Sequence, residues 1–156
     1  MKISNLFDKR RFFKKTYLPY GRQNITSEDI KNVVKVLKKD LITQGESLNK
    51  FEDEIIKKVK SRFAIAVNSA TSALHIACLA LGLKKGDYLW TSPITFVASA
   101  NCGIYCGAKI DFVDIDQDSS LISIKELEKK LKKAKLENKL PKIIIPVHLG
   151  GSSCDM

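Results

Sequence analysis

The chain has 156 residues, with 27 Lys and Arg against 17 Asp and Glu, which gives a formal net charge of +10. A hydrophobic content of 44% and a charged content of 28% are those of one globular domain and exclude a disordered chain. The longest apolar runs are interrupted by Gly or charged residues, and residues 1–15 lack the apolar run of a signal peptide. We therefore expect a soluble, cytoplasmic protein that does not span a membrane.

The first third of the chain predicts an N-terminal arm followed by two amphipathic helices. Residues 1–19 show no strong periodicity and form the predicted arm. Ser27 is the predicted N-cap of the first helix, because acidic residues follow it in the first turn. The second helix is predicted from about residue 47 to 60. Its apolar positions follow helical spacing and are expected to form a buried face: Leu48, Phe51, Ile55 and Val59.

From residue 63 onward, short apolar runs alternate with helical segments. Strands are predicted at residues 63–67, 88–91, 109–113 and 142–147. Helices are predicted at residues 70–81, 95–105 and 123–138, the last opened by a capping box between Ser123 and Glu126. This alternation predicts an α/β fold with right-handed crossovers and a mainly parallel sheet covered by helices on both faces. The last strand is followed by only nine residues, so we expect the sheet to be incomplete.

The positive charge is carried mainly by Lys, with 23 Lys and 4 Arg. Proteins that read nucleic acids typically use Arg for bidentate contacts, and no interleaved aromatic residues accompany the Lys here. We interpret most Lys side chains as parts of solvated helix faces, and keep a basic nucleic-acid-binding domain as an alternative. We expect no nucleic-acid partner.

The four cysteines, Cys78, Cys102, Cys106 and Cys154, contain no Cys-x-x-Cys spacing. The two histidines are distant in sequence, so we expect no metal site. Small buried thiols in a reducing compartment are the favoured interpretation.

Ligands of open parallel sheets bind where the strands end, so the residues after each predicted strand are the candidate site. The segment 68–72 enters a helix N-terminus with hydroxyls at Ser69, Thr71 and Ser72, which is compatible with a phosphate cradle and equally with an ordinary N-cap. No GxGxxG or GK[ST] motif is present, which argues against nicotinamide dehydrogenases and P-loop NTPases. Phe96 follows the second predicted strand and is either an aromatic platform or a core residue. His148 follows the fourth and is either a general base or structural.

Six segments along the chain together carry a family resemblance. They are Leu18-Pro-Tyr-Gly-Arg-Gln23, Leu41-Ile-Thr-Gln-Gly45, Val67-Asn-Ser-Ala-Thr-Ser-Ala-Leu-His75, Trp90-Thr-Ser-Pro-Ile-Thr-Phe-Val-Ala-Ser-Ala-Asn101, Phe112-Val-Asp-Ile-Asp116 and Pro146-Val-His148. In this order and spacing they resemble the pyridoxal-phosphate sugar aminotransferases of the DegT/StrS type, within the aspartate aminotransferase (type I) fold. The resemblance covers about residues 18–156 and implies the N-terminal part of the large domain. After the predicted arm at 1–19, we expect a helical lead-in with a substrate loop at 20–61 and the first part of the cofactor-binding domain at 62–156.

The resemblance also implies roles for individual residues. Ala70 and Thr71 would hold the phosphate of pyridoxal 5′-phosphate through backbone N–H and hydroxyl groups, and Phe96 would stack on its pyridine ring. His75 belongs to the same motif in a structural role. The residues that would line the nucleotide-sugar pocket are Tyr20, Asp40, Leu41, Ile42 and Thr43.

The activity that the resemblance implies is transfer of an amino group from glutamate to C4 of a UDP-linked 4-keto-6-deoxy-N-acetylhexosamine, by a homodimer. The Lys that forms the Schiff base, and the Asp that pairs with the pyridinium nitrogen, would lie beyond the matched stretch. We therefore assign no catalytic residue and expect this chain alone to be inactive. Two further alternatives stay open. One is a sugar dehydratase of the same family. The other is a non-catalytic chain, or half of a split enzyme, that binds only cofactor phosphate, nucleotide sugar or a partner.

Overall fold

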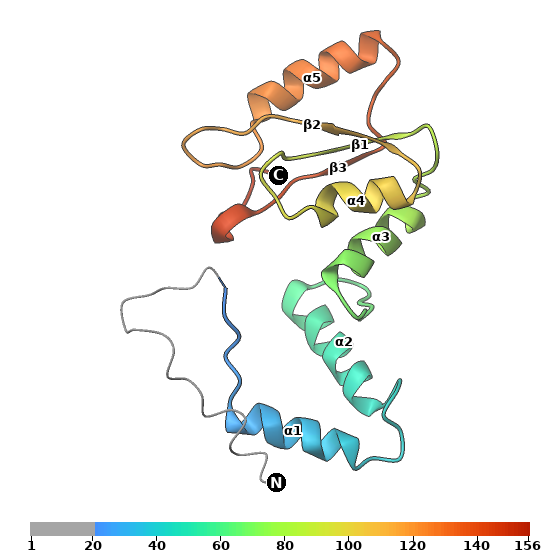
Figure 1. Cartoon of the computed structure of the whole chain (residues 1–156), viewed down its shortest axis with the longest axis vertical. Coiled ribbons are helices and arrows are strands. Elements are labelled where there is room, and N and C mark those ends of the chain that lie inside the picture. Colours follow the sequence, from blue (N-terminus) through green and yellow to red (C-terminus); the bar gives the residue numbers. More distant parts are fainter. Residues whose placement is uncertain (1–20) are drawn as a thin grey trace. The chain divides into compact units, whose positions relative to one another are not determined.

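The computed structural model describes residues 21–156 (Figure 1). The predicted arm at 1–19 and Tyr20 lie outside the described residues. The chain divides into two units, one that ends at Ala64 and one that covers Ile65–Met156.

The first unit contains helices α1 (Ser27–Leu37) and α2 (Glu46–Val59). The N-cap of α1 is Thr26, one residue before the predicted Ser27. Thr26 forms a complete capping box, because its hydroxyl accepts from the Asp29 N–H at 3.2 Å and its own N–H donates to the Asp29 carboxylate at 2.6 Å. The reciprocal pair fixes the helix start, and the hydrogen bonds from Thr26 lower the pKa of Asp29.

The predicted buried face of α2 is not buried within the described residues. Phe51 is 57% exposed and Val59 is 61% exposed, and neither α1 nor α2 contains a buried residue. An amphipathic helix buries its apolar stripe only against a second apolar surface, and the described part of this unit supplies two short helices alone. The helices were therefore predicted correctly, whereas their burial was not.

The second unit is built on a parallel sheet with the order β2-β1-β3. Strand β1 (Tyr88–Thr91) lies in the centre, between β2 (Lys109–Phe112) and β3 (Ile143–Ile145). Thr91 at the end of β1 aligns with the last residue of each neighbour, so the three carboxyl ends share one edge. This confirms the parallel α/β fold expected from the alternation of strands and helices.

Helices cover both faces of the sheet (Figure 1). Helix α4 (Ala98–Tyr105) packs on one face of the sheet, and α3 (Ala70–Ala80) packs against α4. Helix α5 (Ile124–Leu136) lies on the opposite face. Residues of β1 alternate between the two cores. Leu89 joins the core beneath α3 and α4, and Trp90 joins the core beneath α5.

Helix α4 approaches the sheet closely because Gly103 has no side chain. A Cβ built at Gly103 would lie 2.5 Å from Ile110 Cδ1 and 3.2 Å from Leu89 Cβ. Both distances are below ordinary van der Waals separation, so a larger residue here would force Ile110 or Leu89 to shift.

Three expectations for the chain from residue 63 onward need correction. Residues 63–67 form no strand, and Ile65 is 79% exposed, because an extended segment becomes a strand only beside a partner and none of the described strands pairs with it. Helix α4 begins at Ala98 and not at residue 95. The capping box of α5 is half formed: the Ser123 hydroxyl accepts from the Glu126 N–H, but the N–H of Ser123 donates to the Asp114 carbonyl instead of the Glu126 carboxylate.

Candidate functional site

The carboxyl edge of the sheet is held by a side-chain hydrogen bond between two strands. The hydroxyl of Thr91, which is fully buried, donates to the Ile145 carbonyl at 2.9 Å. The segments that follow, from Ser92 and from Pro146, therefore leave the sheet side by side. This is the edge at which open parallel sheets bind ligands.

The N-terminus of α3 offers two free amide donors near this edge. Ser69 is the N-cap, and its hydroxyl accepts from the Ser72 N–H at 3.2 Å. The N–H groups of Ala70 and Thr71 find no hydrogen-bond partner within residues 21–156. Unpaired amides at a helix N-terminus, together with the helix dipole, suit a phosphate. These residues thus fit the phosphate of the cofactor that the sequence implied.

The direction of α3 places those amides on the correct side of the sheet. The C-terminus of α3 closes at Gly82, whose φ is +69°, and the chain enters β1 soon afterwards. Because α3 runs back against the direction of β1, its N-terminus faces the carboxyl edge (Figure 1). The helix predicted over residues 70–81 is confirmed as α3, which ends at Ala80.

Phe96 lies in the turn that joins β1 to α4, and its side chain is 75% exposed. The turn is fixed beside it, since the hydroxyls of Thr95 and Ser99 are 2.9 Å apart and Ser99 is buried. Within the described residues the ring is no part of either core, so a planar ligand ring has access to it. This fits the stacking role better than the alternative of a core side chain.

The loop that follows β3 contains a histidine whose ring is held by the backbone. His148 Nδ1 accepts a hydrogen bond from the Cys154 N–H at 2.9 Å, and the Cys154 thiol donates to the Val147 carbonyl at 3.3 Å. Sequence reasoning identified His148 without a partner. The Gly150-Gly151 pair lets the chain turn back, but it does not identify which later residue returns to the histidine.

His75, which the sequence placed in a structural role, lies within α3. Its ring meets the ring of Tyr105 edge to face, with centroids 5.3 Å apart. This aromatic contact joins α3 to α4 and holds the imidazole in their interface.

The predicted sugar-binding stretch belongs to the first unit. Asp40 and Leu41 line a hollow of about 340 Å³, together with Gly45 and Glu46 at the start of α2. Ion pairs with Lys50 and Lys39 lower the pKa of Glu46 to about 2.

The other predicted residues of this stretch, Ile42 and Thr43, are exposed. All four residues from Asp40 to Thr43 lie in the unit that ends at Ala64, whereas Ala70, Thr71 and Phe96 lie in the other unit.

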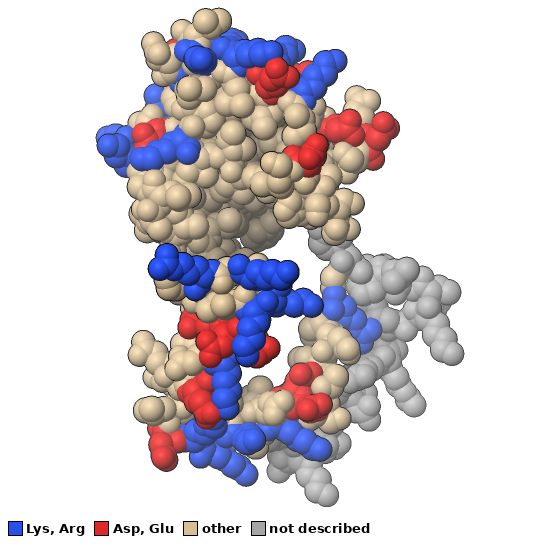
Figure 2. All heavy atoms as spheres, turned by 180° about the vertical axis from the view of Figure 1, so that it is seen from behind, with Lys and Arg blue, Asp and Glu red and all other residues tan. Residues whose placement is uncertain are grey.

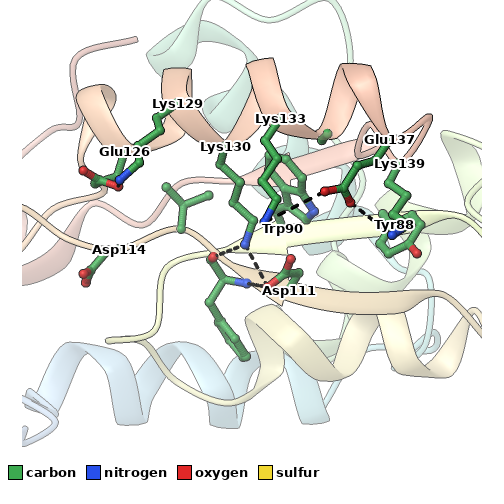
Figure 3. Close-up of a pocket in the computed structure, with 13 residues that line it drawn as sticks. Tyr88, Trp90, Asp111, Asp114, Glu126, Lys129, Lys130, Lys133, Glu137 and Lys139 are labelled. Atoms are coloured by element: carbon green, nitrogen blue, oxygen red, sulfur yellow. Dashed lines mark hydrogen bonds and ion pairs between the residues drawn. The ribbon is translucent and has the colours of Figure 1, made fainter.

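A cavity of about 400 Å³ lies on the α5 face of the sheet, and none of the predicted site residues lines it (Figure 3). Lys130 reaches across it from α5, pairs with the Asp111 carboxylate at 2.8 Å and lies 4.9 Å from the centre of the Trp90 ring. Lys139 pairs with Glu137 along the same wall. The cations of the cavity thus face carboxylates, and no single charge dominates it.

Charge on the face shown in Figure 2 is also mixed in sign. Lys and Arg side chains are interspersed there with Asp and Glu rather than gathered in one field. On α5, Lys132 pairs with Glu128 at 2.6 Å, and its side chain is 75% exposed. This agrees with solvated helix faces. Among residues 21–156 no helix is long and apolar enough to cross a membrane, and no group of His, Cys, Asp or Glu is arranged to hold a metal ion.

Comparison with known proteins points to one family. The sequence model described as the DegT/DnrJ/EryC1/StrS aminotransferase family matches residues 23–156. The chain is 38% identical over 140 residues to the spore coat polysaccharide biosynthesis protein SpsC of Bacillus subtilis, covering 90% of this chain and 34% of that protein. It is 40% identical over 139 residues to a UDP-4-amino-4,6-dideoxy-N-acetyl-beta-L-altrosamine transaminase of Campylobacter jejuni, covering 89% and 36%.

Solved structures agree with this assignment. The putative sugar aminotransferase Spr1654 of Streptococcus pneumoniae, in its PLP form, aligns with a TM-score of 0.77 at 28% identity and covers 88% of this chain and 34% of its own. Helicobacter pylori PseC, an aminotransferase involved in the biosynthesis of pseudoaminic acid, aligns with a TM-score of 0.76 at 30% identity and covers 88% and 36%. The chain thus spans about a third of the length of these relatives. With its parallel sheet and the match over residues 23–156, the chain belongs to the DegT/DnrJ/EryC1/StrS aminotransferase family.

Proposed function

We propose that residues 65–156 form the phosphate-binding and ring-stacking part of a pyridoxal-phosphate-dependent nucleotide-sugar aminotransferase. The observation that carries this proposal is the pair of unpaired amides, Ala70 and Thr71, at an N-terminus that faces the carboxyl edge. The family to which the chain belongs supports the cofactor, and PLP-form and PMP-form structures are known for Spr1654.

Each residue has a defined task in this proposal. The amides of Ala70 and Thr71, with the Thr71 hydroxyl, bind the phosphate, and Phe96 covers one face of the pyridine ring and keeps water from it. When bound, pyridoxal 5′-phosphate supplies a ring that acts as an electron sink during transfer of an amino group. The chain's own contribution is therefore to anchor and orient the cofactor.

The substrate of the complete enzyme is the second part of the proposal. An amino group from glutamate would be transferred to C4 of a UDP-linked 4-keto-6-deoxy-N-acetylhexosamine by a homodimer. The name of the Campylobacter jejuni relative supports this substrate class, as does the involvement of Helicobacter pylori PseC in the biosynthesis of pseudoaminic acid. Tyr20, Asp40, Leu41, Ile42 and Thr43 would line the sugar pocket.

None of the 23 Lys is assigned as the residue that forms a Schiff base. We therefore expect the 156-residue chain by itself to show no transamination of a keto sugar with glutamate and cofactor. Turnover by the purified chain would contradict this expectation.

The anchoring role is tested by calorimetric titration of the chain with pyridoxamine 5′-phosphate. Ala70 is the first residue of α3, where proline is tolerated by a helix, so Ala70→Pro removes one amide donor while leaving the helix in place. Loss of a hydrogen bond to a charged group costs about 1.5–3 kcal/mol, so we expect an affinity about 10- to 100-fold weaker.

The matched control is Ile124→Pro, which makes the same change at the first residue of α5. It is expected to bind as the unaltered chain does. Equal weakening in both variants, or none in Ala70→Pro, would contradict the proposed phosphate site.

A further inference from the structure

The hydrogen bond at His148 determines which ring nitrogen carries the proton. Nδ1 accepts from the Cys154 N–H at 2.9 Å, and a nitrogen that accepts a hydrogen bond carries no proton. In the neutral ring the proton is therefore on Nε2. Within residues 21–156 this Nε2–H has no hydrogen-bond partner, and the residue is exposed. His148 is thus a donor that points away from its own loop.

The loop that holds this ring is anchored in the core. Cys154 is only 6% exposed and belongs to the apolar cluster beneath α5, and its thiol donates back to the Val147 carbonyl at 3.3 Å. Gly150 and Gly151 take φ values of +64° and +86°, which the reversal of the chain requires. The contact that orients His148 is therefore part of the packed structure.

The donor lies at the same edge as the cofactor anchors. The chain reaches His148 three residues after Ile145, which is bonded to Thr91, and reaches Phe96 five residues after Thr91. The short helix after His148, η3 (Leu149–Gly151), lies at the end of the sheet where the connection from β1 to α4 begins (Figure 1). Two adjacent strands thus deliver an aromatic face and an N–H donor to one edge.

We propose that His148 is a binding residue whose Nε2–H donates a hydrogen bond to an anionic oxygen of the molecule held at this edge. Its role differs from that of a general base, because its only basic nitrogen is occupied by the Cys154 N–H. The inference rests on the proposed function. The anionic oxygen belongs either to the cofactor or to the carboxylate of the amino donor, and these two sources are separated by the experiment.

The experiment uses nitrogen-15-labelled chain and long-range proton–nitrogen spectra of the imidazole rings. The chain has two histidines, so His75→Gln assigns both ring systems. We expect the pattern of the Nε2–H tautomer for His148. Pyridoxamine 5′-phosphate is added in one arm of the experiment and glutamate in the other. We expect only one of the two compounds to shift the His148 Nε2 signal, and that compound carries the anionic oxygen.

Two variants separate binding from support of the loop. In His148→Asn the amide oxygen takes the place of Nδ1 and still accepts from the Cys154 N–H, but the outward donor is lost. In His148→Gln a donor reaches toward the position of Nε2, but the acceptor for Cys154 is lost. We expect His148→Asn to keep the Cys154 amide protected from hydrogen exchange. We expect the same variant to bind about tenfold more weakly the compound that shifts the His148 Nε2 signal. His148→Gln is expected to lose that protection and to recover part of the affinity.

The outcomes distinguish this proposal from the proposed function. Two results would overturn the role of His148 and leave the cofactor site intact. One is an Nδ1–H tautomer for His148. The other is unchanged affinity of His148→Asn for both probes, while Phe96→Ala binds pyridoxamine 5′-phosphate more weakly. Absence of binding of both probes to the unaltered chain overturns both.

Discussion

Substitution of Gly103 by Ala tests the close approach of α4 to the sheet. The new methyl group would lie 2.5 Å from Ile110 Cδ1 and 3.2 Å from Leu89 Cβ, against an optimum of about 3.5–4.0 Å between carbon atoms. Overpacking costs about 1–3 kcal/mol, and replacing Gly by Ala inside a helix returns about 1 kcal/mol. We expect a net loss of about 1 kcal/mol in the free energy of unfolding, measured by urea denaturation.

A double-mutant cycle identifies the atom responsible. Ile110→Val removes the Cδ1 atom that the new methyl group would meet, and by itself costs about 0.5–1.5 kcal/mol. In the Gly103→Ala/Ile110→Val chain the methyl group enters the space that Cδ1 has left. We expect the double variant to be more stable than the sum of the single changes predicts, by about 1 kcal/mol.

Two results would refute this reasoning. One is a Gly103→Ala chain more stable than the original, which would mean that helix propensity outweighs packing at this contact. The other is strict additivity in the cycle, which would mean that Ile110 Cδ1 does not limit the approach of α4.

Three other predictions follow from local contacts. Gly45→Ala would place a Cβ 2.8 Å from the Leu41 carbonyl oxygen, so amide exchange across this turn should become faster. Burial is the largest influence on the pKa of Asp111 and acts to raise it, but the hydrogen bonds from Lys130 and from the Phe112 N–H, together with the charge of Lys130, outweigh burial and lower the pKa. The stability from this lowered pKa is present above the ordinary pKa of Asp and is lost as pH falls through the folded value. It should be smaller in urea titrations of Lys130→Met, which keeps the Phe112 hydrogen bond to Asp111. Burial raises the pKa of Cys78 from 9.0 to about 12, so this thiol should resist a thiol reagent at pH 8 until the chain is unfolded, and stability should decline as pH rises from 9 toward 12.

The sequence predicted most of the second unit because its signals are local. The apolar runs of β1 and β2 and the small-residue stretch of α3 lie between glycines and capping residues, and each of these acts within one turn of the chain. Ser123 shows the limit of such rules. Its spacing to Glu126 is that of a capping box, yet its N–H donates a hydrogen bond to the carbonyl of Asp114, nine residues earlier in the chain. Local sequence patterns identify the hydrogen-bond donors of a segment, but they do not show which of several acceptors each donor will bond to.

The failures at residues 63–67 and in α2 have one physical cause, which is dependence on a second surface. Residues 63–67 have the composition of a strand but pair with none of the described strands, and Phe51 has the spacing of a core residue but remains exposed. At the candidate site, the segments at Ala70 and Phe96 were found from the sequence because helix starts and strand ends have local signatures. The bond between His148 and Cys154 has no such signature, since it depends on how the loop folds back.

The alternation of Leu89 and Trp90 on β1 has a practical consequence for following this protein in solution. Trp90 is the only tryptophan of the chain, is 2% exposed and lies on the α5 face beneath Lys130. Its fluorescence therefore reports on the core beneath α5. Detachment of that helix would shift the emission to longer wavelength, whereas events at the N-terminus of α3, on the opposite side of the sheet, would leave the indole in the same surroundings. A single natural fluorophore thus separates the two halves of the core.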